Sequence, residues 1–307
     1  MNTNRWLGRG LFGLAAGLAV TALLGPVGAG IIHYRVSALM LSQLTGADVV
    51  TLVLVAPLSV LTATLALRGH RAAPAFALGP AAYALYTSAE TIVGPDYLRF
   101  AGNNERFFPL YLGVFVLAGA VAVTAWNQID PAAGPSLDRR VERATGGLLV
   151  ALGVFLVLGR YLPGLADAMR AKPTNTDYLA GPTIYWTIAL EDLGVVIPAM
   201  IAVGVGMWRG RAWTARARYA VVGWAALVPV AVAGMAATMY ADNQPSASLS
   251  AIGLLTAMAA VFLIPAALCY PPLLHRTPSD RATQACGDEA TGRVEAAPAH
   301  RVSTLSP

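Results

Sequence analysis

Charged residues are scarce in this chain. Only 12% of its 307 residues are Asp, Glu, Lys or Arg, about half of the share found in a typical soluble domain, whereas 56% are hydrophobic and the mean hydropathy is +0.59. So little charge excludes a soluble monomer, a disordered chain and a small disulfide-linked domain. The composition predicts an all-α, polytopic transmembrane helix bundle.

Motifs that bind metals, cofactors or phosphates are also missing. The sequence contains no G-x-x-x-x-G-K-[ST], G-x-S-x-G or H-E-x-x-H pattern, so nothing supports ATP hydrolysis, serine hydrolysis or zincin chemistry. The single lysine, Lys172, lies outside every predicted span and cannot hold retinal there. The cysteines and histidines, which lack metal-ligand spacing, are Cys269, Cys286, His33, His70, His275 and His300. We therefore expect neither a bound metal nor a cofactor.

Apolar stretches of about 20 residues, the length that crosses a bilayer core, recur along the chain. The eight approximate cores are residues 10–32, 47–67, 74–94, 107–126, 146–163, 184–207, 219–240 and 248–270. The sequence thus predicts a transmembrane helical domain over residues 1–270 and a disordered cytoplasmic tail over residues 271–307. The first span also resembles a signal peptide, but no clean A-x-A cleavage site follows it, so we expect it to be retained.

The basic residues are distributed unevenly between the two sides of the membrane. Eleven arginines fall in connections on one side, and five arginines with Lys172 fall on the other. The richer side is expected to be cytoplasmic, which places both termini inside. The net charge of +5 is explained in the same way, so we expect the lipid bilayer and no nucleic acid as a partner. The preference for Arg over Lys is typical of a GC-rich bacterial genome and indicates a bacterial plasma membrane.

Four carboxylates lie inside predicted spans: Asp48, Glu90, Glu191 and Asp192. Ionisable groups within a bilayer are costly and are functional candidates by default. All four belong to the outer halves of their spans in the expected orientation. Glu191 is the deepest, about 10 Å below the outer end of its helix. This shared depth predicts an acidic pocket that faces outwards.

Helical spacing adds polar neighbours to these carboxylates. Glu90 shares a face with Tyr83 and Tyr86, and Asp48 shares one with Thr51. These polar inner faces are suited to line a pocket. However, Asp48 and Glu90 lie near predicted span ends, and a boundary error of three residues would return them to the headgroup region.

The sixth span carries the two adjacent acids. Spacing places Glu191 on one stripe with Thr187, Gly194 and Pro198, whereas Asp192 points about 100° away. As an alternative to a pocket, Glu191 would lock helices together through an ion pair. The candidate partners for such a pair are Arg106, Arg160 and Arg170.

Two outer loops have an unusual composition. Residues 95–109 concentrate Asn104, Glu105 and Arg106 between aromatic side chains, and residues 164–183 form a turn-rich segment. We expect both loops to fold over the mouth of the pocket, although solvated connectors would have the same composition. Aromatic residues near span ends, including Tyr111, are expected to be membrane-interface anchors.

At several of these positions the chain resembles a group of uncharacterised bacterial polytopic membrane proteins. The resemblance covers roughly residues 47–240 and implies shape and site position, but no activity. Its motifs are Ala82 to Tyr86, Asn104 to Phe108, Tyr111, Pro173 to Asn175, Asp192, Leu193 and Pro198.

The sixth span is also similar to EXPERA-type sterol-binding and sterol-isomerising proteins. In those proteins an acid precedes a helix proline by six residues, and Asp192 and Pro198 have that spacing. The similarity implies a lipophilic ligand for this span. The EXPERA-type proteins have about half as many helices as this chain is expected to have.

Three functions fit these features. The first is binding or transport of a small molecule or cation in the outward-facing acidic and aromatic pocket. The second is a membrane-embedded enzyme of isomerase or terpenoid cyclase type, in which carboxylates act as acid and base on a lipophilic substrate. The third is a scaffold or accessory subunit. The candidate ligand-binding residues are Asp48, Tyr83, Tyr86, Glu90, Asn104, Glu105, Arg106, Thr187, Glu191 and Asp192.

Overall fold

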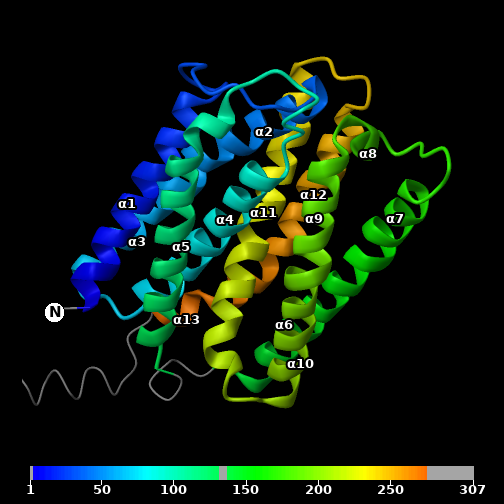
Figure 1. Ribbon diagram of the computed structural model, residues 1–307. Coiled ribbons are helices and arrows are strands. Elements are labelled where there is room, and N and C mark those ends of the chain that lie inside the picture. Colours follow the sequence, from blue (N-terminus) through cyan, green and yellow to red (C-terminus); the bar gives the residue numbers. More distant parts are fainter. Residues whose placement is uncertain (1–2, 131–136, 275–307) are drawn as a thin grey trace, which may run out of the picture.

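The computed structural model describes residues 3–130 and 137–274, and within these ranges every regular element is a helix (Figure 1). The helices run alternately up and down, and the described chain begins and ends on the same side of the bundle (Figure 1). The all-helical fold class agrees with the sequence prediction. The predicted tail lies outside the described residues, except for a short helix, α13, over Pro271–Leu274.

Three of the long helical units are composite. In chain order the elements are α1 (Thr3–Leu24), α2 (Ala38–Val50), η1 (Thr51–Val55), α3 (Ala56–Leu67), α4 (Ala73–Val93), η2 (Asn104–Phe107), α5 (Phe108–Gln128), α6 (Arg139–Phe155), η3 (Leu156–Tyr161), α7 (Leu162–Ala168), α8 (Thr176–Ala180), α9 (Pro182–Glu191), η4 (Asp192–Val196), α10 (Ile197–Arg209), α11 (Thr214–Ala241), α12 (Leu249–Cys269) and α13. The unit α2–η1–α3 is a continuous rod, and so are α6–η3–α7 and α9–η4–α10.

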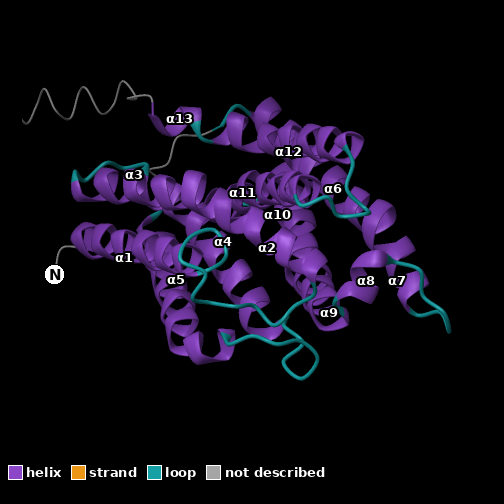
Figure 2. Ribbon diagram, turned by 90° about the horizontal axis from the view of Figure 1, so that it is seen from above, coloured by secondary structure: helices purple, strands orange, loops and turns teal. Residues whose placement is uncertain are grey.

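Seven of the helical units are long and apolar enough to cross a membrane, so the described chain has the architecture of a multi-pass membrane protein. They correspond to seven of the predicted spans. The remaining predicted span, 74–94, is α4, which is long enough but is diluted by polar residues. Helix α4 packs against α3, α5, α9 and α11, and 12 of its 21 residues are buried, compared with 5 of 21 in α5. It is therefore an interior helix (Figure 2).

The predicted ends of the first two spans are wrong. Helix α1 stops at Leu24, not near residue 32, and α2 begins at Ala38, not near residue 47. The apolar residues after Leu24 belong to a loop, which turns at Gly30 with a φ of +60°. Ile32 in this loop is only 1% exposed, because the loop packs back onto the end of the bundle. The apolar run thus continues beyond α1 into a loop that is mostly exposed over residues 26–31, and composition alone did not mark the end of the helix.

Three helix crossings depend on paired glycines. A Cβ placed on Gly146 of α6 would lie 2.5 Å from the carbonyl oxygen of Gly204 on α10. Gly223 of α11 meets Gly79 of α4 in the same way, with 2.5 Å from the added Cβ to the Gly79 Cα. A similar contact joins α2 to α11, where a Cβ on Gly46 would meet backbone atoms. In a membrane, where burial of apolar surface does not drive helix association, such close backbone packing is a main source of stability.

We predict that Gly146→Ala destabilises the bundle by about 1–3 kcal/mol, since the new methyl group meets backbone that cannot move without separating α6 from α10. The measurement is unfolding of the purified protein in mild detergent. The neighbouring Gly147 is the matched control, because a Cβ there meets nothing within 4 Å. Equal destabilisation by Gly146→Ala and Gly147→Ala would show that the crossing does not limit stability.

Candidate functional site

Three wide helical turns position the polar residues of the interior. They are the π-helical segments η1, η3 and η4, in which hydrogen bonds span five residues, as from the Ile197 amide to the Asp192 carbonyl. A proline follows each segment within two residues: Pro57, Pro163 and Pro198. Because proline has no N–H, the helix cannot continue its regular bonding there, and a wide turn results. Single π turns of this kind are frequent at functional sites.

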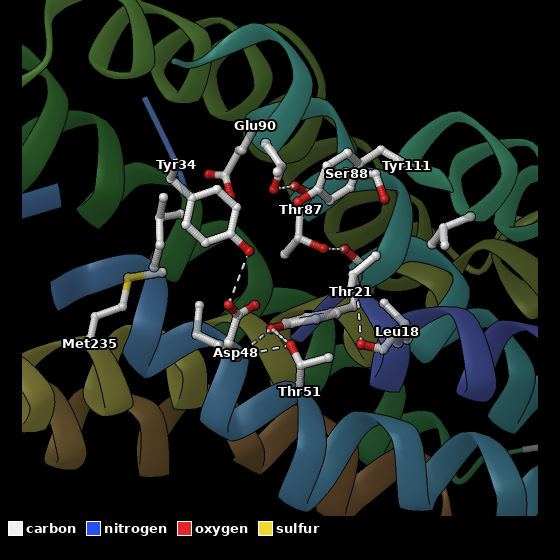
Figure 3. A pocket seen from close by; sticks show the side chains of 15 residues that line it. Leu18, Thr21, Tyr34, Asp48, Thr51, Thr87, Ser88, Glu90, Tyr111 and Met235 are labelled. Carbon is white, nitrogen blue, oxygen red and sulfur yellow. Dashed lines mark hydrogen bonds between the residues drawn. The ribbon is translucent and has the colours of Figure 1, made fainter. Parts of the chain in front are cut away.

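A small cavity lies between α1, α2, α4, α5 and α11, beneath the loop that follows α1 (Figure 3). Its volume is about 40 Å³. Asp48 and Glu90 enter it from α2 and α4, and Figure 3 shows both carboxylates beside the Tyr34 ring. The lining residues are Leu18, Thr21, Tyr34, Leu44, Ala47, Asp48, Thr51, Tyr83, Thr87, Ser88, Glu90, Thr91, Tyr111, Val114 and Met235.

The cavity presents oxygen atoms and no basic group. The Tyr34 hydroxyl donates to Asp48 Oδ2 at 3.1 Å, and the hydroxyls of Tyr83 and Thr51 lie 2.8 Å apart. The buried Tyr111 hydroxyl has no hydrogen-bond partner in the described chain. None of the lining residues is Arg, Lys or His, so two carboxylates share a largely enclosed space without a protein cation in its wall.

A second polar cluster adjoins the cavity at Asp192, which is 5% exposed. The Tyr86 hydroxyl donates to Asp192 Oδ1 at 3.0 Å, and the Tyr161 hydroxyl donates to Oδ2. Arg160 lies beside Tyr161, with its Cζ 5.4 Å from the ring centroid, and it interacts electrostatically with both Asp192 and Glu90. Glu90 therefore belongs to both groups, as a wall of the cavity and as a neighbour of the Asp192 cluster.

Glu191 lies at the edge of this cluster. It is half-buried, and its Oε2 atom is buried without a hydrogen-bond partner in the described chain. The alternative in which Glu191 locks helices through an ion pair is wrong for this structure, since no basic side chain lies within 4.0 Å of its carboxylate among the described residues. The Thr187 hydroxyl donates to the Thr183 carbonyl at 2.9 Å and does not line the cavity.

Two of the candidate residues in the loop over residues 95–109, Asn104 and Glu105, bind Arg35 in the segment before α2. Glu105 accepts two hydrogen bonds from Arg35, at 2.9 and 2.7 Å, and these bonds raise the pKa of the Arg35 guanidinium. Asn104 is 2% exposed, and its Oδ1 accepts from the Arg35 amide at 3.2 Å. Arg106 is exposed. Together Asn104 and Glu105 hold the two outer segments against each other, above the cavity and outside its lining.

Several residues of the site were not among those predicted from sequence. Tyr34 and Tyr161 each bind a carboxylate, and Trp224 packs edge-on against Tyr86 with ring centroids 5.5 Å apart. Tyr111 was predicted to be an interface anchor, and this is wrong: it is 4% exposed and lines the cavity. The only sequence signal for Tyr161 is its position beside Arg160 and two residues before a proline.

No group of three or more His, Cys, Asp or Glu side chains that could hold a metal ion occurs in residues 3–130 and 137–274. Comparison with protein-family models, with curated proteins and with solved structures found no match for this chain. Both family resemblances therefore stay predictions, and function has to be argued from the geometry.

We predict that Asn104→Ala loosens the outer loops without affecting the interior helices. The substitution leaves the Arg35 amide without its partner, which costs about 1–3 kcal/mol locally. Hydrogen exchange should accelerate over residues 31–36 and 95–103 and stay unchanged in α4. Arg106→Gln, in the same loop but exposed, is the control and should leave exchange as in the parent protein. Equal exchange in the Asn104→Ala variant and the parent would remove Asn104 from the loop contact.

Proposed function

We propose that this protein binds and conducts a small inorganic cation, either a proton or an ion of the size of Na⁺, through the cavity lined by Asp48 and Glu90. One observation carries the proposal: two carboxylates line a cavity of about 40 Å³ whose wall contains no basic side chain. A buried carboxylate must be neutralised by a proton or a counterion. Arg160 acts on Glu90 from outside the cavity, but no lining residue supplies a positive charge to Asp48, so the ligand supplies it.

The size of the cavity supports an ion over a larger ligand. A water molecule needs about 10–15 Å³ of such volume, so the cavity accommodates a few waters or a partly hydrated cation. Pockets for drug-sized molecules measure about 300–1,000 Å³. The small volume thus favours binding of a cation over an enzyme that acts on a sterol or terpenoid.

The chemistry of the wall is also that of a cation site. Carboxylate, hydroxyl and carbonyl oxygens are the ligands of hard cations, and the Thr51 hydroxyl, the Tyr83 hydroxyl and the Ala47 carbonyl come together beside Asp48. Phenol and carboxyl groups in series are equally suited to pass protons. In the first case the oxygens coordinate the ion, and in the second they relay a proton.

The Asp192 cluster is the proposed continuation of the path. From Asp48, the path passes Glu90 and reaches Asp192, where the Tyr86 and Tyr161 hydroxyls bind both carboxylate oxygens. Arg160 provides a fixed positive charge that limits how many cations occupy this end at once. Glu191, with a buried oxygen lacking a partner, is the proposed acceptor at the edge.

We predict that Asp48→Asn and Glu90→Gln each abolish ion movement while preserving the fold. Purified protein is reconstituted in liposomes with an imposed diffusion potential, and proton uptake (a trapped pH dye) and ²²Na⁺ uptake are measured separately. The parent protein should move one of the two ions, and each variant should fall to the rate of protein-free liposomes, because the neutral amide cannot hold the cation.

Asp177→Asn is the matched control for the Asp48 substitution, since Asp177 is exposed and lies outside the cavity lining. It should leave uptake unchanged. Circular dichroism melting of all samples tests the fold. If the parent protein moves neither ion, or if both cavity variants retain full uptake, the proposal is wrong.

We further propose that α4 and the seven apolar helical units all cross a bacterial plasma membrane, with the described ends, Thr3 and Leu274, on the cytoplasmic side. The support is the arginine excess of the connections on that side. The loops beside the cavity then face outwards.

A labelling experiment tests this orientation. In a chain without native cysteines, Leu98→Cys should react with a membrane-impermeant maleimide in intact cells, because Leu98 is fully exposed in an outer loop. Ala212→Cys, in the exposed connection between α10 and α11, should react only after permeabilisation. The reverse pattern of labelling would invert the topology.

A further inference from the structure

An arginine-lined hollow opens between α6 and α10 at the end of the bundle opposite the Asp48 cavity. Its volume is about 420 Å³, and it is lined by Arg143, Val205, Trp208 and Arg209. It lies about one turn beyond the close crossing of Gly146 and Gly204. Beyond the glycines, Arg139 of α6 donates to the Met207 and Trp208 carbonyls of α10, so the two helices stay joined beside the hollow.

The two arginines of the hollow have no partner within residues 3–130 and 137–274. Neither Arg143 nor Arg209 forms a hydrogen bond or an ion pair with another residue of the described chain, and both are exposed. The nearest acid in sequence, Glu142, is engaged elsewhere: it lies 3.0 Å from Arg139 and 3.8 Å from Arg218. The hollow therefore carries two uncompensated positive charges.

The surroundings of the hollow are apolar on the side of the bundle surface. Trp208 is 58% exposed, and further along α6 Val154 and Phe155 are 42% and 48% exposed. An indole at the end of a membrane helix is suited to the headgroup level, and exposed apolar side chains further along the helix are suited to contact acyl chains. Charge and apolar surface thus adjoin each other at the depth where a phospholipid has both.

We propose that this hollow binds the phosphodiester headgroup of an anionic phospholipid. The guanidinium forks of Arg143 and Arg209 hold the phosphate oxygens, Trp208 covers the glycerol region, and the acyl chains lie along α6. The apolar surface beside the arginines favours a lipid over free inorganic phosphate. The site is separate from the Asp48 cavity and does not depend on the proposed ion conduction.

Native mass spectrometry of the full chain in mild detergent tests the proposal, with phosphatidylglycerol and phosphatidylcholine of identical acyl chains as probes. The parent protein should bind one phosphatidylglycerol in preference to phosphatidylcholine. The double variant Arg143→Gln/Arg209→Gln should bind phosphatidylglycerol about 30-fold more weakly, the loss expected for two interfacial arginines. The control Arg5→Gln/Arg68→Gln removes the same charge from exposed arginines outside the hollow and should retain the affinity.

Two results would overturn the proposal. One is equal binding of phosphatidylglycerol by the parent and the Arg143→Gln/Arg209→Gln variant. The other is displacement of the lipid by millimolar inorganic phosphate, which would assign the hollow to a soluble anion instead. Persistence of the bound lipid in phosphate, together with its loss in the double variant, supports the phospholipid site.

Discussion

The polar interior of this protein depends on the enclosure of α4 by other helices. A helix facing lipid cannot carry a carboxylate, two tyrosines and several hydroxyls along one half of its length without a large cost in free energy. Helix α4 can, because α3, α5, α9 and α11 surround it and its polar side chains meet protein on every side. The stripe of α4 that supplies Tyr83 and Glu90 to the cavity also carries Tyr86, which binds Asp192. The two polar groups are neighbours because a single buried helix belongs to both.

The sequence predicted the helical architecture well and the helix ends less well. Long apolar stretches identify membrane helices because the bilayer demands about 20 residues of low polarity. The same rule failed after Leu24, where the apolar run continues into a loop. It also did not distinguish the interior helix α4 from the seven helical units that are apolar enough to span a membrane. An analysis that assumes 3.6 residues per turn could not detect the π-helical segments η1, η3 and η4. The extra residue in η4 rotates everything beyond it by about 100°, so Pro198 no longer shares a stripe with Glu191.

The cost of burying charge led the sequence analysis to four carboxylates that the fold brings close together. Asp48, Glu90, Glu191 and Asp192 were identified because a carboxylate inside a span needs a reason to be there, and the structure places all four in or beside one polar interior. A tyrosine in a span does not indicate a functional site in this way, since its phenol is stable at a membrane interface, in a core or beside a carboxylate. The partners of Asp48 and Asp192 therefore emerged only from the fold.

The Gly79–Gly223 contact has a consequence for how the protein is made. Helix α4 is less apolar than the seven helical units that are suited to span a membrane, yet its partner α11 is synthesised much later. At translation rates of roughly 5–20 residues per second, Gly223 leaves the ribosome roughly 7–30 s after Gly79. During that interval α4 can pack only against α1 and α3, which precede it in the chain, and α5, which follows it directly. The order of synthesis therefore orders assembly: α4 first packs against α1, α3 and α5, and α11 packs against α4 afterwards.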